Sequence, residues 1–322
     1  MQPFARKADK VKRIVIALGG NALGNTSEEQ LERVRITAEA VAAIVKEGFQ
    51  VVVCHGNGPQ VGMINLAFEQ GSESGIVPRM ELPECTAMSQ GYIGYHLQQA
   101  IDQALVKNGI NHIVVITMLT QVIVDQNDPG FKNPLKPIGG YYSKEEAMRL
   151  TKETGHTYAE DSGRGYRRVV ASPRPVSIYE RISLNTLINS NHVVIAGGGG
   201  GIPVVKEAGG SYHGVPAVVD KDLAAEKLAE LIDADAFVIL TAVDRVSIRF
   251  GKPDQKDLDQ ITLKEAEAYA AEGHFAPGSM LPKVQAAMEF IKAKENGTSL
   301  ICSLEQVTDA LKGKTGTRIV NG

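Results

Sequence analysis

The sequence has few cysteines and no long hydrophobic run, and both absences narrow the class of protein. Its three cysteines among 322 residues are scattered, and none belongs to a C-x-x-C pair, so neither a disulfide framework nor a structural zinc site is expected. The apolar stretch behind the basic residues 1–13 runs only from Ile14 to Leu18, which is too short for a signal-peptide core. No later run is long enough to span a membrane. We therefore expect a cytoplasmic protein.

The sequence also lacks an excess of charge of either sign. A formal net charge of −3 gives no general electrostatic reason to expect nucleic acid or a membrane as a partner. With 43% hydrophobic residues the chain can bury a substantial core, so a disordered protein is excluded.

Several motifs of well-known enzyme classes are absent. No stretch reads G-x-G-x-x-G, and the only Gly-Lys-Thr, at 313–315, lacks the upstream glycine of a P-loop because position 308 is threonine. A dinucleotide oxidoreductase and a P-loop ATPase therefore lose their main support. The seven histidines show no metal-ligand spacing, so no protein metal site is expected, and no G-x-S-x-G elbow marks a serine nucleophile.

Short β-branched runs alternate with helical patterns along the chain. Apolar residues recur at helical spacing from Leu31 to Val45, and Gly48 marks the end of this predicted helix. A second predicted helix covers 86–107. Near-continuous apolar strands joined by helices predict an α/β protein with an open, mainly parallel central sheet and helices on both faces. The predicted strands are 13–18, 50–54, 112–118, 192–196, 236–241 and 298–302.

Two glycine-asparagine loops follow the first two predicted strands. The first is Gly19-Gly20-Asn21 and the second is Gly56-Asn57-Gly58, with His55 beside it. Glycines at a strand-to-helix junction let backbone N–H groups approach an anion closely. Two such loops predict one site that holds a charged group between them, and a third cluster, 197–201, follows a later strand in the same way.

Residues 126–175 interrupt the alternation. This stretch carries nine Lys or Arg against six Asp or Glu, and Ser143 with Glu146 forms a capping box for a short helix. We interpret it as a small projecting lobe or lid; the alternative is an ordinary surface insertion.

Lys283 is the sharpest single candidate for chemistry. It follows Pro282, which suits the first position of a helix, so the lysine lies in the first helical turn. A cation is unfavourable there unless an anionic ligand is shared with the helix terminus. The alternative is a flexible, solvated lysine.

Lys221 repeats this pattern between Asp220 and Asp222. An aspartate before a helix is most often a cap, but a lysine flanked by two carboxylates is also suited to a fixed pose over a phosphate. Thr241 to Asp244 ends another predicted strand, where either a ribose contact or a plain turn fits.

These segments together resemble carbamate kinase, over about residues 13 to 320. The resemblance lies in ALGGNAL at 17–23, HGNGPQVG at 55–62, AMSQGYIGYHLQ at 87–98, FKNPLKPIG at 131–139, EDSGRGYRRVVASPRP at 160–175, AGGGGGIPV at 196–204, VVDKDLA at 218–224 and HFAPGSMLPKV at 274–284.

The resemblance implies an amino-acid-kinase fold and a specific reaction. The fold would be one domain over 1–322, with an acceptor lobe over 11–212 that includes a projecting subdomain at 126–175, and a nucleotide lobe over 213–322. The reaction would be ATP plus carbamate giving ADP plus carbamoyl phosphate, with Mg²⁺, in a homodimer, and the family context would be ATP formation during arginine breakdown.

The resemblance also assigns roles to residues of this sequence. Lys221 and Lys283 would flank the phosphates, Asp222 would fix both lysines, and Lys136 would reach in from the projecting subdomain. The carbamoyl and phosphoryl groups would lie among Gly19, Gly20, Asn21, Gly56, Asn57 and Gly58. The nucleotide would contact Thr241, Ala242, Asp244, Ala276, Gly278 and Met280.

Two other readings remain open from the sequence. One is a kinase of the same fold that acts on another carboxylate or phosphate acceptor. The other is a carbamoyl phosphate sensor without catalysis, which would not require Lys221, Asp222 and Lys283 together. A dehydrogenase ranks behind both.

Overall fold

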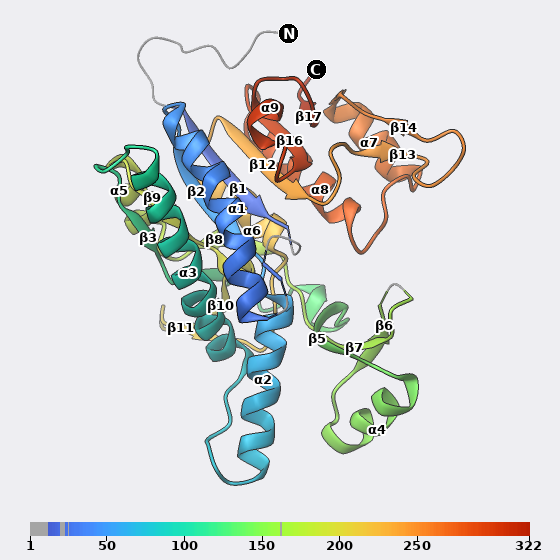
Figure 1. Cartoon of the computed structure of the whole chain (residues 1–322). Helices are drawn as coiled ribbons and strands as arrows, with labels where there is room; N and C mark the ends of the chain where they lie inside the picture. Colours follow the sequence, from blue (N-terminus) through green and yellow to red (C-terminus); the bar gives the residue numbers. More distant parts are fainter. Residues whose placement is uncertain (1–11, 20–22, 25, 162) are drawn as a thin grey trace.

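A computed structural model describes residues 12–19, 23–24, 26–161 and 163–322 of the chain (Figure 1). Within these ranges the largest sheet has eight strands in the order β15-β17-β16-β12-β1-β2-β9-β3. Every neighbouring pair is parallel except β16 with β17. The strands are β1 (Arg13–Leu18), β2 (Gln50–His55), β3 (Val115–Thr117), β9 (Val193–Ile195), β12 (Ala236–Thr241), β15 (Gln260–Thr262), β16 (Thr298–Ser303) and β17 (Thr317–Val320).

The predicted mainly parallel sheet is confirmed, and all six predicted strands lie in it. The predicted strand 112–118 is shorter than expected, because only Val115–Thr117 pairs with β9. The edge strand β15 and its neighbour β17 were not predicted. β15 is three residues long and β17 begins with Thr317 and Arg318, so neither gives a clear hydrophobic run.

Helices cover both faces of this sheet, as the alternation along β1 requires. Val15 and Ala17 pack into one apolar cluster with α5, α6 and α8, whereas Ile14, Ile16 and Leu18 pack into another with α1, α3 and α9. Full burial of each valine, isoleucine or leucine side chain contributes about 1.5–3 kcal/mol, so packing on both faces of the sheet stabilises the layered fold. The helices are α1 (Ser27–Lys46), α3 (Leu82–Lys107), α5 (Arg181–Asn189), α6 (Lys221–Leu231), α7 (Leu263–Ala271), α8 (Met280–Ala293) and α9 (Val307–Leu311). Among the described residues, no helix combines the length and the apolar character needed to cross a bilayer.

A second sheet of four strands continues beyond the end of the first, in the order β11-β10-β4-β8. Its strands are β4 (Gln121–Val124), β8 (Pro175–Ile178), β10 (Ile202–Lys206) and β11 (Tyr212–Gly214). The buried side chain of Gln90 joins the two connections between the sheets. Its amide nitrogen donates to the carbonyl oxygens of Gly198 and Thr120, at 2.9 and 3.2 Å, and its oxygen accepts from the Thr120 backbone at 2.9 Å.

The third glycine cluster forms the short turn η3 (Gly198–Gly200), which packs against the start of α2 (Gly58–Glu73). Gly199 has a φ of +67°, and a β-carbon on it would lie 2.1 Å from the Asn57 side-chain nitrogen. Both the backbone conformation and the space therefore require glycine here. The third glycine cluster thus packs against the second glycine-asparagine loop and supports it.

The stretch 126–175 contains a small subdomain that projects from the body, at the lower right of Figure 1. Its three-stranded sheet, in the order β5-β7-β6, carries α4. Its elements are η2 (Pro129–Phe131), β5 (Lys136–Tyr142), α4 (Lys144–Thr154), β6 (Tyr158–Glu160) and β7 (Tyr166–Val170). The predicted capping box is present at the start of α4, where the Ser143 backbone donates to Glu146 and the Glu146 backbone donates to Ser143.

The subdomain contacts the body along α2. Arg168 on β7 donates to Glu69 at 2.9 Å, and His156 contacts the same carboxylate. Gly62 on α2 lies against Gly139 on β5, where a β-carbon on Gly62 would come within 2.1 Å of the Gly139 Cα. The division of the body into lobes at 212 and 213 stays a prediction; the large sheet runs across it, because β12 pairs with β1. The hairpin of β13 (Ser247–Ile248) and β14 (Lys256–Asp257) lies apart from the other sheets.

The Gly62–Gly139 contact predicts a specific sensitivity of the subdomain. In Gly62→Ala the new methyl meets backbone atoms that no rotamer change can move, so β5 must shift away from α2. We expect faster proteolysis within residues 126–175, measured by limited digestion and mass spectrometry. The matched control is Gly91→Ala, on the exposed side of α3 with no neighbour within 4 Å of its added carbon, which we expect to stabilise the helix by about 0.5–1 kcal/mol. Unchanged digestion of the Gly62 variant would contradict this account.

Candidate functional site

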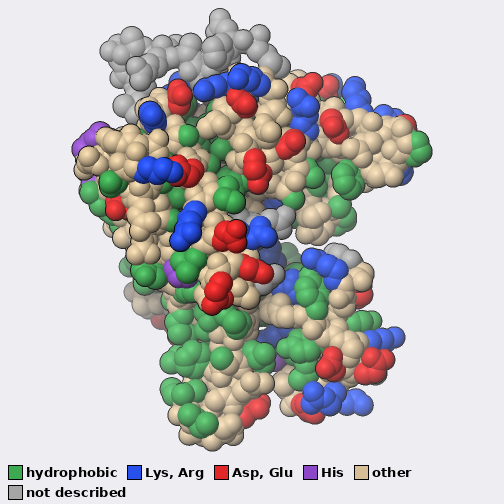
Figure 2. All heavy atoms as spheres, viewed as in Figure 1, with side chains coloured by type: hydrophobic (Ala, Val, Ile, Leu, Met, Phe, Trp, Pro, Cys, Tyr) green, Lys and Arg blue, Asp and Glu red, His purple; other side chains and the backbone are tan. Residues whose placement is uncertain are grey.

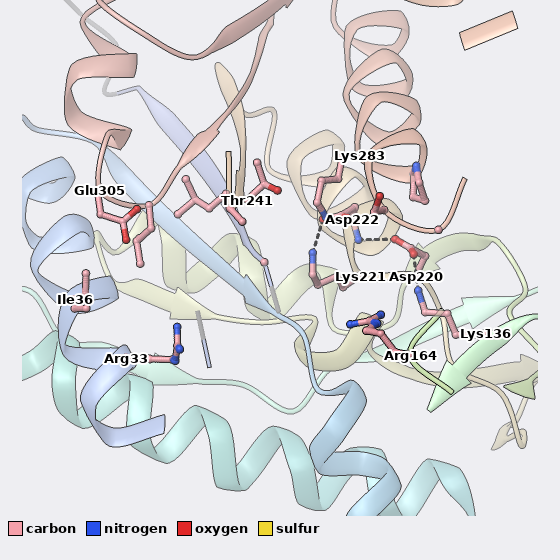
Figure 3. Close-up of a pocket in the computed structure, with 17 residues that line it drawn as sticks. Arg33, Ile36, Lys136, Arg164, Asp220, Lys221, Asp222, Thr241, Lys283 and Glu305 are labelled. Atoms are coloured by element: carbon pink, nitrogen blue, oxygen red, sulfur yellow. Dashed lines mark hydrogen bonds and ion pairs between the residues drawn. The ribbon is translucent and has the colours of Figure 1, made fainter. Parts of the chain in front are cut away.

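The described residues line three adjoining cavities at the carboxyl ends of β1, β2 and β12. The central cavity, of about 670 Å³, contains Lys136, Lys221, Asp222 and Lys283 (Figure 3). A cavity of about 810 Å³ shares Lys136, Arg164 and Lys221 with it and opens between α2 and the projecting subdomain; we call it the acceptor cavity, after the role that the resemblance implies for its glycine loop. A cavity of about 480 Å³ shares Thr241, Ser279 and Lys283 with the central one; we call it the nucleotide cavity, likewise after the expected role of its residues.

Asp222 joins two lysines from different helices at the centre. Its Oδ1 accepts from Lys221 Nζ at 2.6 Å, and its Oδ2 accepts from Lys283 Nζ at 2.9 Å. The side chain of Asp222 is 4% exposed, and those of Lys221 and Lys283 are 14% and 15% exposed. The predicted first-turn position of Lys283 is confirmed, and the alternative of a solvated lysine is wrong. Pro282 is the third residue of α8, not the first as expected.

The helix cap expected in the Asp220–Asp222 segment is confirmed, whereas the pose of Lys221 over a phosphate stays a prediction. Asp220 caps α6, since its Oδ1 accepts from the Asp222 backbone N–H at 2.9 Å. Its other oxygen accepts from Lys136 Nζ at 2.6 Å, and Lys136 begins β5 of the projecting subdomain. The cap of one helix therefore also links the subdomain to the body.

The charges of this cluster shift one another's titration. Burial raises the pKa of Asp222, but the ammonium groups of Lys221 and Lys283 outweigh it and hold that pKa well below its usual range. Burial lowers the pKa of Lys221, but Asp222 and Asp220 outweigh it and raise that pKa. The pKa of Lys283 is lowered by burial and by the neighbouring charge of Lys221. Lys283 shares the carboxylate of Asp222 with Lys221, so an incoming anion would favour its protonated form.

The second glycine-asparagine loop lies where the sequence predicted. Gly56, Asn57 and Gly58 line the acceptor cavity, and Gly56 packs against the stem of Lys221, where a β-carbon would lie 3.3 Å from Cδ. Asn57 is 3% exposed and donates from Nδ2 to Ser89 at 2.8 Å. Of the first loop, Gly19 lines the central cavity, while Gly20 and Asn21 lie outside the described residues.

His55 supports this loop without carrying a charge. It donates from Nδ1 to the Gly56 carbonyl oxygen at 2.8 Å, and burial lowers its pKa to about 4. At neutral pH the ring is therefore uncharged, and it adds nothing to the positive charge of the site.

The residues predicted to bind the nucleotide divide between two cavities. Thr241, Ala242 and Gly278 line the central cavity, and Thr241, Ala276 and Met280 line the nucleotide cavity. Asp244 lines none of the three; it is exposed and accepts a hydrogen bond from Ser303. Its predicted contact with the nucleotide stays a prediction.

Sequence reasoning assigned no role to Arg164, although it lines both the central and the acceptor cavity. It lies in the turn between β6 and β7, at the edge of the projecting subdomain. A signal was present, because an arginine between two glycines lies inside the stretch of positive local charge.

Comparisons with known proteins point to one family. The sequence profile of the amino acid kinase family matches residues 12–302. The chain is 54% identical to a carbamate kinase of Clostridium perfringens over 314 residues, which cover 96% of this chain and 99% of that protein. It is 52% identical to a carbamate kinase of Staphylococcus haemolyticus, with 96% and 99% covered. Its structure is similar to that of carbamate kinase from Giardia lamblia bound to AMP-PNP, with a TM-score of 0.87, 44% identity, and 96% and 98% of the two chains covered.

The buried cluster predicts a strong effect of removing its carboxylate. Asp222→Asn leaves two lysines without an anionic partner inside the protein, and loss of one partner of a buried pair typically costs about 3–5 kcal/mol. We expect a loss of that order in the free energy of unfolding, measured by urea denaturation at neutral pH. The control is Glu153→Gln, which removes the partner of Arg149 from a surface pair whose side chains are 51% and 62% exposed, and which should cost about 1 kcal/mol or less. Equal losses of unfolding free energy in the two variants would contradict the view that Asp222 compensates two buried charges.

Proposed function

The chain belongs to the amino acid kinase family, and we propose that it is a carbamate kinase, which transfers a phosphoryl group between ATP and carbamate. The resemblance and the fold predicted from the sequence are thereby confirmed. The observation that carries the proposal is the Lys221–Asp222–Lys283 cluster. It lies in the central cavity, which shares residues with the acceptor cavity on one side and with the nucleotide cavity on the other.

The reaction needs carbamate and the terminal phosphate of ATP, both anions, to be held in line, and the lysines and glycine loops of the site can hold them. Carbamate already carries a negative oxygen, so no general base is required to start its attack on phosphorus. This agrees with a site in which His55 is uncharged and Asp222 is engaged by two lysines. Charge spreads over the equatorial phosphoryl oxygens in the transition state, and fixed cations stabilise it there.

We assign the steps to residues by their places around the cavities. The loop of Gly56, Asn57 and Gly58 positions the carbamoyl group, together with Gly19 of the first loop. Gly20 and Asn21 lie outside the described residues, and we assign them to the same group from the sequence resemblance alone. Lys221 and Lys283 hold the phosphoryl group from the body, and Lys136 holds it from the projecting subdomain. Asp222 keeps the first two lysines at a fixed separation before substrate arrives, so little reorganisation is needed during transfer.

Mg²⁺ would reach this site on the nucleotide. Among the described residues, no group of three His, Cys, Asp or Glu side chains lies close enough to hold a metal ion. Both oxygens of Asp222 accept from lysines, and those of Asp220 accept from Lys136 and from the α6 backbone. These residues therefore do not fit a protein-held metal, and the phosphates of ATP or ADP would be its ligands.

The direction of flux and the setting are part of the proposal. We propose that the enzyme forms ATP from carbamoyl phosphate in arginine breakdown in the cytoplasm. The test is to mix the protein with ADP, Mg²⁺ and carbamoyl phosphate and to follow ATP. Absence of ATP, with carbamoyl phosphate still bound, would favour the sensor; ATP formed from another acyl phosphate in a substrate panel would favour a related kinase.

We further propose that the enzyme is a homodimer. Large apolar side chains are exposed around the edge strand β8, including Val176 at 57%, Tyr179 at 50% and Ile182 at 75%. A surface of this kind is suited to burial against a second copy. Sedimentation equilibrium decides between a dimer and a monomer.

The lysines of the body should be essential for rate. We expect Lys283→Ala and Lys221→Ala to lower ATP formation by about 10²–10³-fold, as is typical when one transition-state contact is lost. Circular dichroism should show an intact fold. Near-normal turnover in either variant would remove that lysine from the mechanism.

Lys136 should act on one substrate more than on the other. It lines the central and acceptor cavities and not the nucleotide cavity. We therefore expect Lys136→Ala to raise the KM for carbamoyl phosphate more than the KM for ADP. Equal changes in both constants would contradict its assignment to the acceptor side.

A further inference from the structure

We propose that Arg164 is a further catalytic residue, which contacts the transferred phosphoryl group from the projecting subdomain. This inference rests on the proposed function and adds a fourth cation to its three lysines. Arg164 comes from the subdomain and faces the body, as Lys136 does, and Figure 3 shows its guanidinium directed into the cavity on the side of Lys221 and Lys136.

The position of Arg164 selects the group that it would contact. It lines the central cavity with the lysines and the acceptor cavity with the second glycine loop. It does not line the nucleotide cavity, which contains Ala276 and Met280. In the proposed reaction, the phosphoryl group passes between the central cavity and the acceptor cavity, whereas the rest of the nucleotide stays in the nucleotide cavity. We therefore place Arg164 against the phosphoryl group.

The restraints on Arg164 are weak, so the side chain can change partners. Its side chain is 62% exposed, its contact with Asp161 is 3.4 Å long, and its guanidinium carbon lies 5.0 Å from the centre of the Tyr141 ring. Gly163 and Gly165 flank it with φ values of +73° and +126°, which other residues rarely adopt. The two glycines therefore allow a tight turn from which the Arg164 side chain projects.

Arg167, on the neighbouring strand, shows what a structural arginine looks like here. Its side chain is 12% exposed, and it donates from two nitrogens to the Gly139 carbonyl oxygen, at 3.1 and 2.8 Å. Those bonds tie β7 to β5 and leave little of the guanidinium for a ligand. Arg164 makes no comparable link to the backbone among the interactions resolved for the described residues.

Arg164 can add positive charge that the three lysines do not supply. Lys136, Lys221 and Lys283 each lie within 2.9 Å of a carboxylate, so two aspartates already offset much of their charge. Arg164 is 62% exposed and shares its partner Asp161 with Arg167, so its charge is less compensated. Its planar guanidinium also presents two parallel N–H donors that match two phosphoryl oxygens, a geometry that a single ammonium nitrogen lacks.

The test compares Arg164→Ala and Arg164→Lys with Arg149→Ala in the ADP and carbamoyl phosphate assay. Arg149 lies on α4 of the same subdomain, is 62% exposed, and lines none of the three cavities. We expect Arg164→Ala to lower kcat by about 10²–10³-fold, with the KM for ADP unchanged, and Arg164→Lys to recover only part of the loss. Guanidinium at millimolar concentration should restore part of the activity of Arg164→Ala and none of that of Lys283→Ala. Arg149→Ala should match the wild type.

Each possible result decides between a catalytic and a structural role of Arg164. A kcat within about threefold of the wild type in Arg164→Ala, or a KM for ADP that rises as much as that for carbamoyl phosphate, overturns the role of Arg164 and leaves the proposed function standing. A lower melting temperature in both Arg164 variants, without rescue by guanidinium, shows that the residue only supports the turn. Failure of the wild-type protein to form ATP removes the proposed function, and this inference falls with it.

Discussion

One buried carboxylate constrains the whole site. Asp222 accepts from two lysines in the first turns of different helices, and its side chain is almost fully shielded from water. Two ammonium groups would repel each other at this separation without an anion between them, and burial would strengthen the repulsion. The aspartate therefore sets the distance between the ammonium groups of Lys221 and Lys283, at the start of two helices, α6 and α8, that belong to one apolar cluster. The three cavities meet at these lysines, so their arrangement follows from the same interaction.

The sheet provides the frame in which this interaction can form. β1, β2 and β12 are neighbouring parallel strands, so their carboxyl ends meet at one edge of the sheet. The loops after β1 and β2 supply glycine backbone, and the last residue of β12, Thr241, lines two cavities. Segments more than 160 residues apart in sequence thereby share one site, because parallel order in the sheet fixes where their ends lie.

The sequence predicts the centre of this protein better than its periphery. The core strands are apolar without interruption, so 13–18 and 236–241 match the observed bounds of β1 and β12. The lysines were identifiable because each stands at the start of a strongly periodic helix. β15 and β17, at one end of the sheet, bury only part of their residues, and their mixed composition hides them. Arg164 was missed for a different reason: the glycines on either side of it indicate a turn, but the direction in which that turn points depends on tertiary contacts. The shared role of Asp220, as a helix cap and as a partner of Lys136, also depends on tertiary contact.

The ion pair between Lys136 and Asp220 has a consequence for selectivity. The subdomain brings its cation to the body already matched with an anion. A phosphate bound by Lys136, as proposed, would exchange with a resident carboxylate and would not meet a bare positive charge. Inorganic anions that offer only charge would gain little from such an exchange. A substrate that also fills the neighbouring cavities would gain further contacts, so the ion pair would favour it over simple salts.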